Sequence, residues 1–101
     1  MAAVRGLSHV LFGQRYRLEL MVAIAASADG LVCLTDLAKE LDVTASNLQN
    51  SLRALTSAGL VARMSSGDSR RRYYVRQDSL AWDFATQIAQ RAGALALTAP
   101  D

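Results

Sequence analysis

The stretch Thr35–Val61, TDLAKELDVTASNLQNSLRALTSAGLV, decides the fold of this chain of 101 residues. It predicts two short helices joined by a tight turn at Asp42-Val43, with the second helix ending at Gly59. The second helix has an apolar stripe at the i, i+4, i+7 spacing of a buried face. That stripe consists of Leu48, Leu52 and Leu55. We therefore expect one side of this helix to pack on the core.

The opposite side of the second helix carries hydrogen-bonding side chains and neither Glu nor Lys. These residues are Ser46, Asn47, Gln49, Asn50 and Arg53. A solvated helix face usually carries Glu and Lys, whereas Asn, Gln and Arg suit the base edges of a DNA major groove. We predict that these residues contact double-stranded DNA, beside Thr44, which is expected to cap the helix.

The charge distribution favours the same kind of partner. Six arginines and one acid, Asp68, lie between residues 53 and 76, so this segment carries +5 while the whole chain carries only +2. A local basic patch on a nearly neutral protein indicates a directed contact with an anionic partner such as nucleic acid. We expect the adjacent Arg70, Arg71 and Arg72 to reach the DNA backbone or minor groove. A merely solvated, arginine-rich loop is the alternative.

Length and composition predict one globular domain over residues 1–101, because the chain is 51% hydrophobic and 20% charged. No run approaches the roughly 18 apolar residues of a membrane span, so we expect no membrane partner. The single cysteine, Cys33, excludes an internal disulfide and fits a reducing compartment. These features predict a cytoplasmic protein.

The flanking segments complete the expected order of elements. Helices are predicted at Ala2–Leu11 and Gln14–Ala26, a short strand at Leu31–Cys33, and Thr35 is expected to cap the helix after it. A hairpin follows at residues 60–76, in which we expect Tyr73 and Val75 to point inward, although the adjacent tyrosines leave the register open by one residue.

The closing helix, from Leu80 to about Ala92, has more apolar positions than one small domain buries easily, with Trp82 to the side. A partner helix from a second copy would cover them. We predict a homodimer through Leu80, Phe84, Ile88 and the N-terminal helices, so that residues 1–26 and 79–95 contribute to its interface.

The predicted order is helix, helix, strand, helix, helix, strand, strand, helix, which is mainly α with a small β-hairpin wing. It resembles a winged helix-turn-helix. Residues 43–61, VTASNLQNSLRALTSAGLV, and the basic segment SSGDSRRRYYV are similar to the recognition helix and wing of ArsR-type repressors and, second, of MarR-type repressors. The resemblance covers about residues 9 to 90. It implies a dimeric, sequence-specific transcriptional regulator, of repressor type.

The chain departs from the ArsR metal sensors at their Cys-Val-Cys-Asp-Leu motif. The matching run here is Cys33-Leu34-Thr35-Asp36-Leu37, which keeps one of the two thiols. Soft metals need several thiolate or imidazole ligands, so we predict no metal site and no cofactor, and a buried Cys33. A thiol redox switch at Cys33 is the alternative.

No catalytic function is predicted. The sequence has no Gly-rich phosphate loop, no paired His and carboxylate at a useful spacing, and no nucleophile-elbow serine. Two alternatives to a regulator remain open, a winged-helix protein-interaction module and a plasmid- or replication-associated DNA-binding module.

Overall fold

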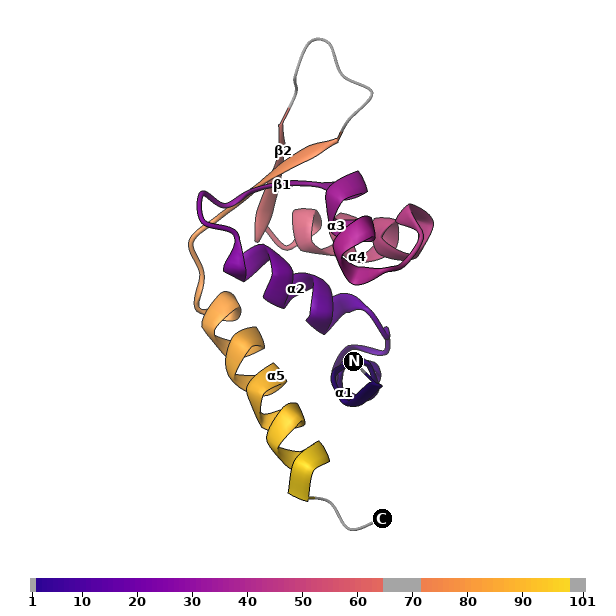
Figure 1. The fold of residues 1–101 in the computed structure, drawn as a ribbon. Helices are drawn as coiled ribbons and strands as arrows, with labels where there is room; N and C mark the ends of the chain where they lie inside the picture. The colour runs from indigo at the N-terminus through magenta and orange to yellow at the C-terminus, as the bar shows by residue number, and fades with distance from the viewer. Residues whose placement is uncertain (1, 65–71, 99–101) are drawn as a thin grey trace.

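The computed structural model describes residues 2–64 and 72–98, and its elements follow the predicted order (Figure 1). The helices are α1 (Ala2–Phe12), α2 (Arg17–Ala26), α3 (Leu34–Leu41), α4 (Ala45–Ser57) and α5 (Leu80–Thr98). The strands are β1 (Leu31–Cys33), β2 (Val61–Met64) and β3 (Tyr73–Arg76). The predicted fold is confirmed. The protein is a mainly helical winged helix-turn-helix in which α3 and α4 form the helix-turn-helix, and β2 and β3 form the stem of the wing.

Three element boundaries differ from the sequence prediction. The second helix begins at Arg17 rather than Gln14. The prediction that Thr35 caps α3 was wrong, because β1 runs directly into a helix that begins at Leu34, with the extended Cys33 at the N-cap position. The last helix continues to Thr98, beyond the expected end near Ala92.

The central element is α2, which crosses the middle of the molecule between the helix-turn-helix and the pair α1 and α5 (Figure 1). It contacts all four other helices. Leu18, Leu20 and Ile24 are each 0% exposed. Because side chains from several faces of α2 are buried, its backbone ends lie close to other elements and must find their hydrogen-bond partners there.

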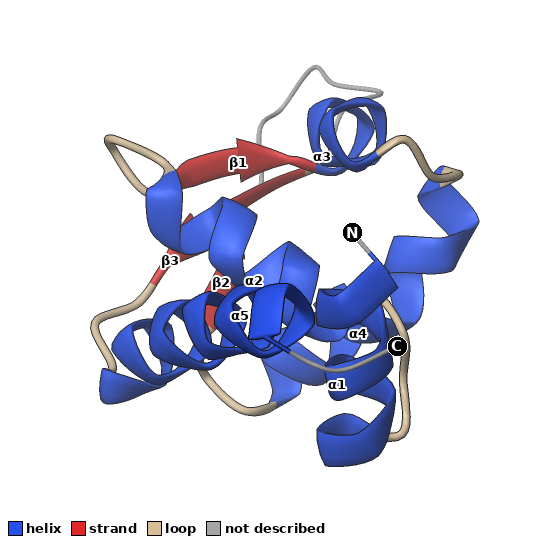
Figure 2. Ribbon diagram, turned by 60° about the horizontal axis from the view of Figure 1, so that its bottom comes forward, coloured by secondary structure: helices blue, strands red, loops and turns tan. Residues whose placement is uncertain are grey.

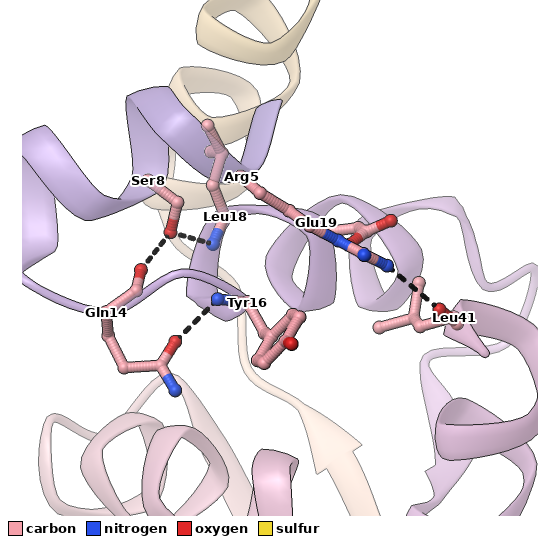
Figure 3. Close-up of polar contacts among 7 residues, drawn as sticks. All are labelled: Arg5, Ser8, Gln14, Tyr16, Leu18, Glu19 and Leu41. Carbon is pink, nitrogen blue, oxygen red and sulfur yellow. Dashed lines mark hydrogen bonds and ion pairs between the residues drawn. The ribbon is translucent and has the colours of Figure 1, made fainter. Parts of the chain in front are cut away.

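The amino end of α2 is satisfied by a buried serine from α1 (Figure 3). The hydroxyl of Ser8 accepts a hydrogen bond from the Leu18 N–H at 3.0 Å and donates one to the Gln14 carbonyl. The side-chain carbonyl of Gln14 accepts the Tyr16 N–H at 2.7 Å. These bonds hold residues 13–16 in a tight connection, which explains why α2 begins later than predicted.

A single arginine on α1 joins three helices (Figure 3). The Nε of Arg5 donates to Glu19 Oε1 of α2 at 2.8 Å, and its Nη2 donates to the Leu41 carbonyl at the end of α3 at 3.1 Å. Its guanidinium also lies 5.1 Å from the ring centroid of Tyr16. The hydrogen bond with Glu19 raises the pKa of Arg5 above its ordinary value. The end of α3, where the helix-turn-helix bends, is therefore tied to α1.

The three strands form one antiparallel sheet in the order β1-β3-β2 (Figure 2). In β3, Tyr74 is buried, while Tyr73 and Val75 are only partly buried. The prediction that Tyr73 and Val75 point inward was therefore wrong, because the inward positions are shifted by one residue. The inward-facing side of β3 instead carries Tyr74 and Arg76, and the exposed Arg72 precedes Tyr74 by two residues. Long arginine side chains tolerate this face because their stems pack and their charged heads reach polar groups.

Trp82 anchors α5 to the sheet end of the molecule. It is 6% exposed, and its indole N–H donates to the Gln77 carbonyl at 2.7 Å. The expectation that Trp82 lies to the side was wrong, because this hydrogen bond lets the whole ring be buried. None of the helices in the described segments is long and apolar enough to cross a membrane.

The Ser8→Ala substitution should destabilise the protein by about 1–3 kcal/mol, because it leaves the buried Leu18 N–H without an acceptor. Urea denaturation followed by circular dichroism measures this change. Ser57→Ala, which removes a hydroxyl from an exposed position of α4, is the control and should change stability by less than about 0.5 kcal/mol. Equal effects of the two substitutions would contradict the role given to Ser8.

Candidate nucleic-acid interface

The helix α4 presents two different faces, as its sequence pattern predicts. Leu48 and Leu52 are 0% exposed and Leu55 is 3% exposed. The five polar residues predicted to read bases are all exposed. They are Ser46, Asn47, Gln49, Asn50 and Arg53. The structure thus leaves the side of α4 opposite the leucines open to a partner, and contact of these side chains with bases stays a prediction.

Ser51 is a polar residue on the buried side of α4 that the sequence pattern did not single out. It is 0% exposed, and its hydroxyl accepts a hydrogen bond from Arg17 Nε at 3.4 Å. Arg17 begins α2, so this contact fixes the recognition helix against the central helix. A buried serine among leucines carried no distinguishing signal in the sequence.

The turn between α3 and α4 lies where the sequence predicted it. Asp42 adopts a left-handed conformation with φ 57° and ψ 48°, which Asp tolerates better than most residues. The Val43 N–H returns to the Ala38 carbonyl at 3.0 Å. This sharp reversal sets the start of α4 directly after the end of α3.

Thr44 occupies the N-cap position of α4 but does not cap it through its side chain. Its hydroxyl instead lies 3.0 Å from the hydroxyl of Ser46, and both residues are exposed. The prediction that the Thr44 side chain caps α4 was therefore wrong. A helix amino end that no side chain caps is suited to an anion, because its free N–H groups and the helix dipole both favour negative charge.

The described part of the wing contains one of its three predicted arginines. Arg72 is exposed just before β3. Arg70 and Arg71 lie outside the described residues. On β2, Arg63 is exposed and pairs across the strands with Tyr74.

Between α4 and the wing stem lies a hollow of about 280 Å³, which we call the arginine hollow. It is lined by Gln49, Arg53, Thr56, Ser57, Arg63, Arg72 and Tyr74. Sequence reasoning placed Gln49, Arg53 and Arg72 in the site but missed Thr56, Ser57, Arg63 and Tyr74. Strand alternation could have found Arg63, because it shares a face with Val61, which is 2% exposed.

Arg76 has a different role from the other arginines in the basic segment. Its Nη1 donates to three carbonyls at the carboxyl end of α2, those of Ile24 (2.8 Å), Ala25 (2.9 Å) and Ser27 (2.9 Å). Gly30, with φ 74°, lies against it, and a Cβ there would come within 3.3 Å of the Arg76 Cβ. Arg76 therefore closes a helix end inside the protein, and its charge does not belong to the exposed basic surface.

Cys33 is buried, at 3% exposed, as the sequence predicted. It pairs with Tyr73 across the sheet. Within residues 2–64 and 72–98, no group of three or more His, Cys, Asp and Glu side chains could hold a metal ion. His9, the single histidine, lies exposed on α1.

A winged helix-turn-helix with an exposed polar second helix is an architecture typical of DNA-binding transcriptional regulators. Residues 16–63, which include the helix-turn-helix, match the family model described as bacterial regulatory protein, arsR family. The resemblance to the ArsR family seen in the sequence is confirmed over these residues.

Solved structures share the fold of nearly the whole chain. AbsC, a MarR family transcriptional regulator from Streptomyces coelicolor, is 21% identical with a TM-score of 0.65, over 97% of this chain and 72% of that chain. Reduced AbfR bound to DNA is 19% identical with a TM-score of 0.61, over 98% and 69% of the two chains.

A transcriptional regulator homologue from Pyrococcus horikoshii OT3 is 24% identical with a TM-score of 0.61, over 97% and 99% of the two chains. A search of curated protein sequences found no match. At these identities the structural likeness establishes the fold.

A comparison of Arg76 with an exposed arginine, Arg53, tests whether Arg76 has a structural role. Arg76→Met should lower the free energy of unfolding by about 2–3 kcal/mol, because it leaves the carbonyls at the end of α2 without their charged donor. Arg53→Met, at an exposed position of α4, should change it by less than about 0.5 kcal/mol. Urea denaturation of both variants measures the difference, and equal stabilities would contradict the assignment.

Proposed function

We propose that the protein is a dimeric repressor that recognises a specific operator in double-stranded DNA. The observation that carries this proposal is the exposed face of α4, which offers amides, hydroxyls and a guanidinium without Glu or Lys. Asn and Gln side chains suit adenine, and Arg suits guanine or a phosphate. In this proposal α4 enters the major groove with five exposed residues. Ser46, Asn47, Gln49 and Asn50 contact base edges, and Arg53 contacts guanine or a phosphate.

Contacts with the DNA backbone would hold α4 in register. The amino end of α4, at Thr44, has no side-chain cap and can bind a phosphate through its N–H groups. Arg70, Arg71 and Arg72 of the wing would reach the backbone or the adjacent minor groove. Reduced AbfR, which shares the fold, has been solved bound to DNA, and this supports DNA binding by the present chain.

A second copy of the chain would cover the apolar surface of α5 and the N-terminal helices. Leu80 is 83% exposed and Phe84 is 49% exposed, and both share one helix face with the half-buried Ile88. On α1, Val10 is 77% exposed and Leu11 is 46% exposed. Exposed apolar side chains of this size on two terminal helices favour an interface. Residues 1–26 and 79–95 would therefore form the dimer contact of a single domain over residues 1–101.

Dimerisation determines the kind of operator that the protein would recognise. Two-fold symmetry presents two copies of α4, so the operator should be roughly palindromic, with half-sites about one helical turn apart. A dimer bound at such a site would repress by occupying promoter DNA. Its place of action would be the cytoplasm, where bacterial DNA lies.

Asn50→Ala should weaken binding to an operator selected from random duplexes by about 1–3 kcal/mol and relax the preference at one base pair, because an amide pair to a base is lost. Its affinity for random DNA should not change. Mobility-shift titrations at two salt concentrations measure both affinities, with Gln90→Ala, an exposed amide on α5, as the control. The proposed function would be refuted if the natural protein bound no DNA, or if its DNA binding did not depend on salt.

Phe84→Glu should convert the dimer to a monomer at micromolar concentration, because it would place an unpaired charge in an apolar interface. Light scattering gives the molar mass. Thr35→Glu adds the same charge at an exposed position of α3, outside the proposed interface, and should leave the dimer intact. A natural protein that is monomeric, or a Phe84→Glu variant that stays dimeric, would refute the proposed interface.

A further inference from the structure

We infer that the arginine hollow between α4 and the wing stem is a binding site for one DNA backbone phosphate. This inference rests on the proposed function and makes it more specific. It assigns Arg53, Arg63 and Arg72 to a single anionic group instead of to separate contacts, and it brings into the site a residue, Arg63, that the sequence pattern did not identify.

The geometry of the sheet explains why these side chains meet. Arg63 on β2 lies directly opposite Tyr74 on β3, and Arg72 lies two residues before Tyr74 on the same face. Tyr74 is 7% exposed, and its neighbour on that face of β2, Val61, is 2% exposed. This face therefore packs toward α4, and its two arginines emerge beside the recognition helix.

The third arginine comes from α4 itself. Arg53 is exposed and shares the hollow with Thr56 and Ser57, which follow it by three and four residues. The Thr56 hydroxyl donates to the Leu52 carbonyl at 2.7 Å, so it is occupied as a donor. Ser57 has an exposed hydroxyl at the same edge. The hollow thus combines three guanidinium groups with the exposed hydroxyl of Ser57.

The positive charge of the hollow favours a bound anion. Its lining residues include three arginines and no acid, which makes a formal charge of +3. No described residue forms a hydrogen bond or an ion pair with the side chains of Arg53, Arg63 or Arg72. Like charges gathered in one hollow repel one another, and a bound anion relieves that repulsion.

Arginines that face the interior of the protein differ from those of the hollow in having partners. Arg76 lies on the same face of β3 as Arg72, yet its guanidinium binds three backbone carbonyls. Arg5 pairs with Glu19, and Arg17 donates to Ser51. The arginines that face the interior have internal acceptors, whereas the three around the hollow are left for an external one.

A backbone phosphate fits this arrangement better than a base edge does. Arginine binds phosphate oxygens through two parallel N–H groups, and several guanidinium groups can surround one phosphate. The hollow lies between the helix proposed to enter the major groove and the wing proposed to follow the backbone. A strand bordering the groove must pass between these two elements. Arg53 then acts on the backbone, and base reading falls to the exposed residues nearer the amino end of α4.

The test combines one protein change with one DNA change. Arg63→Gln should weaken binding to the selected operator and to random DNA alike by about tenfold, because a charged hydrogen bond is lost. It should also lower the salt slope by about one unit. Lys39→Gln removes the same charge from an exposed position of α3 and should change neither value. Thermal denaturation checks that both variants fold.

Replacing single operator phosphates by neutral methylphosphonates locates the contact with the natural protein alone. One position in each half-site should cost about tenfold in affinity, and that cost should vanish in Arg63→Gln, because the two changes remove the same interaction. Additive effects at every position, or equal affinities of Arg63→Gln and Lys39→Gln, would overturn the phosphate site while leaving the proposed function intact.

Two further results separate this inference from its basis. If the natural protein binds no DNA, both the proposed function and the phosphate site are refuted. Titration with inorganic phosphate distinguishes a free anion from the backbone. Micromolar binding of inorganic phosphate that Arg63→Gln abolishes, with unchanged DNA affinity in that variant, would assign the hollow to a small anion and overturn the inference.

Discussion

The structure depends on hydrogen bonds to the free backbone groups at both ends of α2, a helix that has little access to water. Because α2 buries side chains on several faces, backbone groups at its ends would be costly to leave unpaired. Ser8 of α1 accepts the Leu18 N–H at one end, and Arg76 of β3 donates to the carbonyls of Ile24 and Ala25 at the other. Two side chains from distant parts of the chain therefore complete one helix.

These two contacts also position the proposed DNA-binding surface. Arg76 holds the base of the wing against α2, and Arg17 of α2 holds the recognition helix through Ser51. Arg5 adds a bond from α1 to the Leu41 carbonyl, at the bend of the helix-turn-helix. The recognition helix, its turn and the wing stem are thus each bonded, directly or through α2, to the same internal frame. Such a frame keeps the exposed residues of α4 and the arginine hollow in a fixed relation.

The sequence predicted what local periodicity encodes. The stripe of Leu48, Leu52 and Leu55 gave the buried face of α4 correctly, and Gly59, with φ 78°, ends that helix as expected. The inward face of β3 was misjudged because the stripe of arginines looked like a solvent face, and nothing near Arg76 in sequence indicates its carbonyl acceptors. Contacts between residues about fifty positions apart leave no periodic trace. Arg63 was missed for the related reason that its neighbours in the hollow come from α4 and β3.

The bond between Arg76 and Ile24 spans 52 residues, and this separation bears on the order in which the chain folds. The carboxyl end of α2 gains its charged donor only after β3 has docked, which requires the helix-turn-helix and the hairpin to be in place. Contacts of such long sequence separation are costly to close early. Folding of this domain should therefore be a single cooperative event, and a fragment that stops before β3 would lack the group that completes its own central helix.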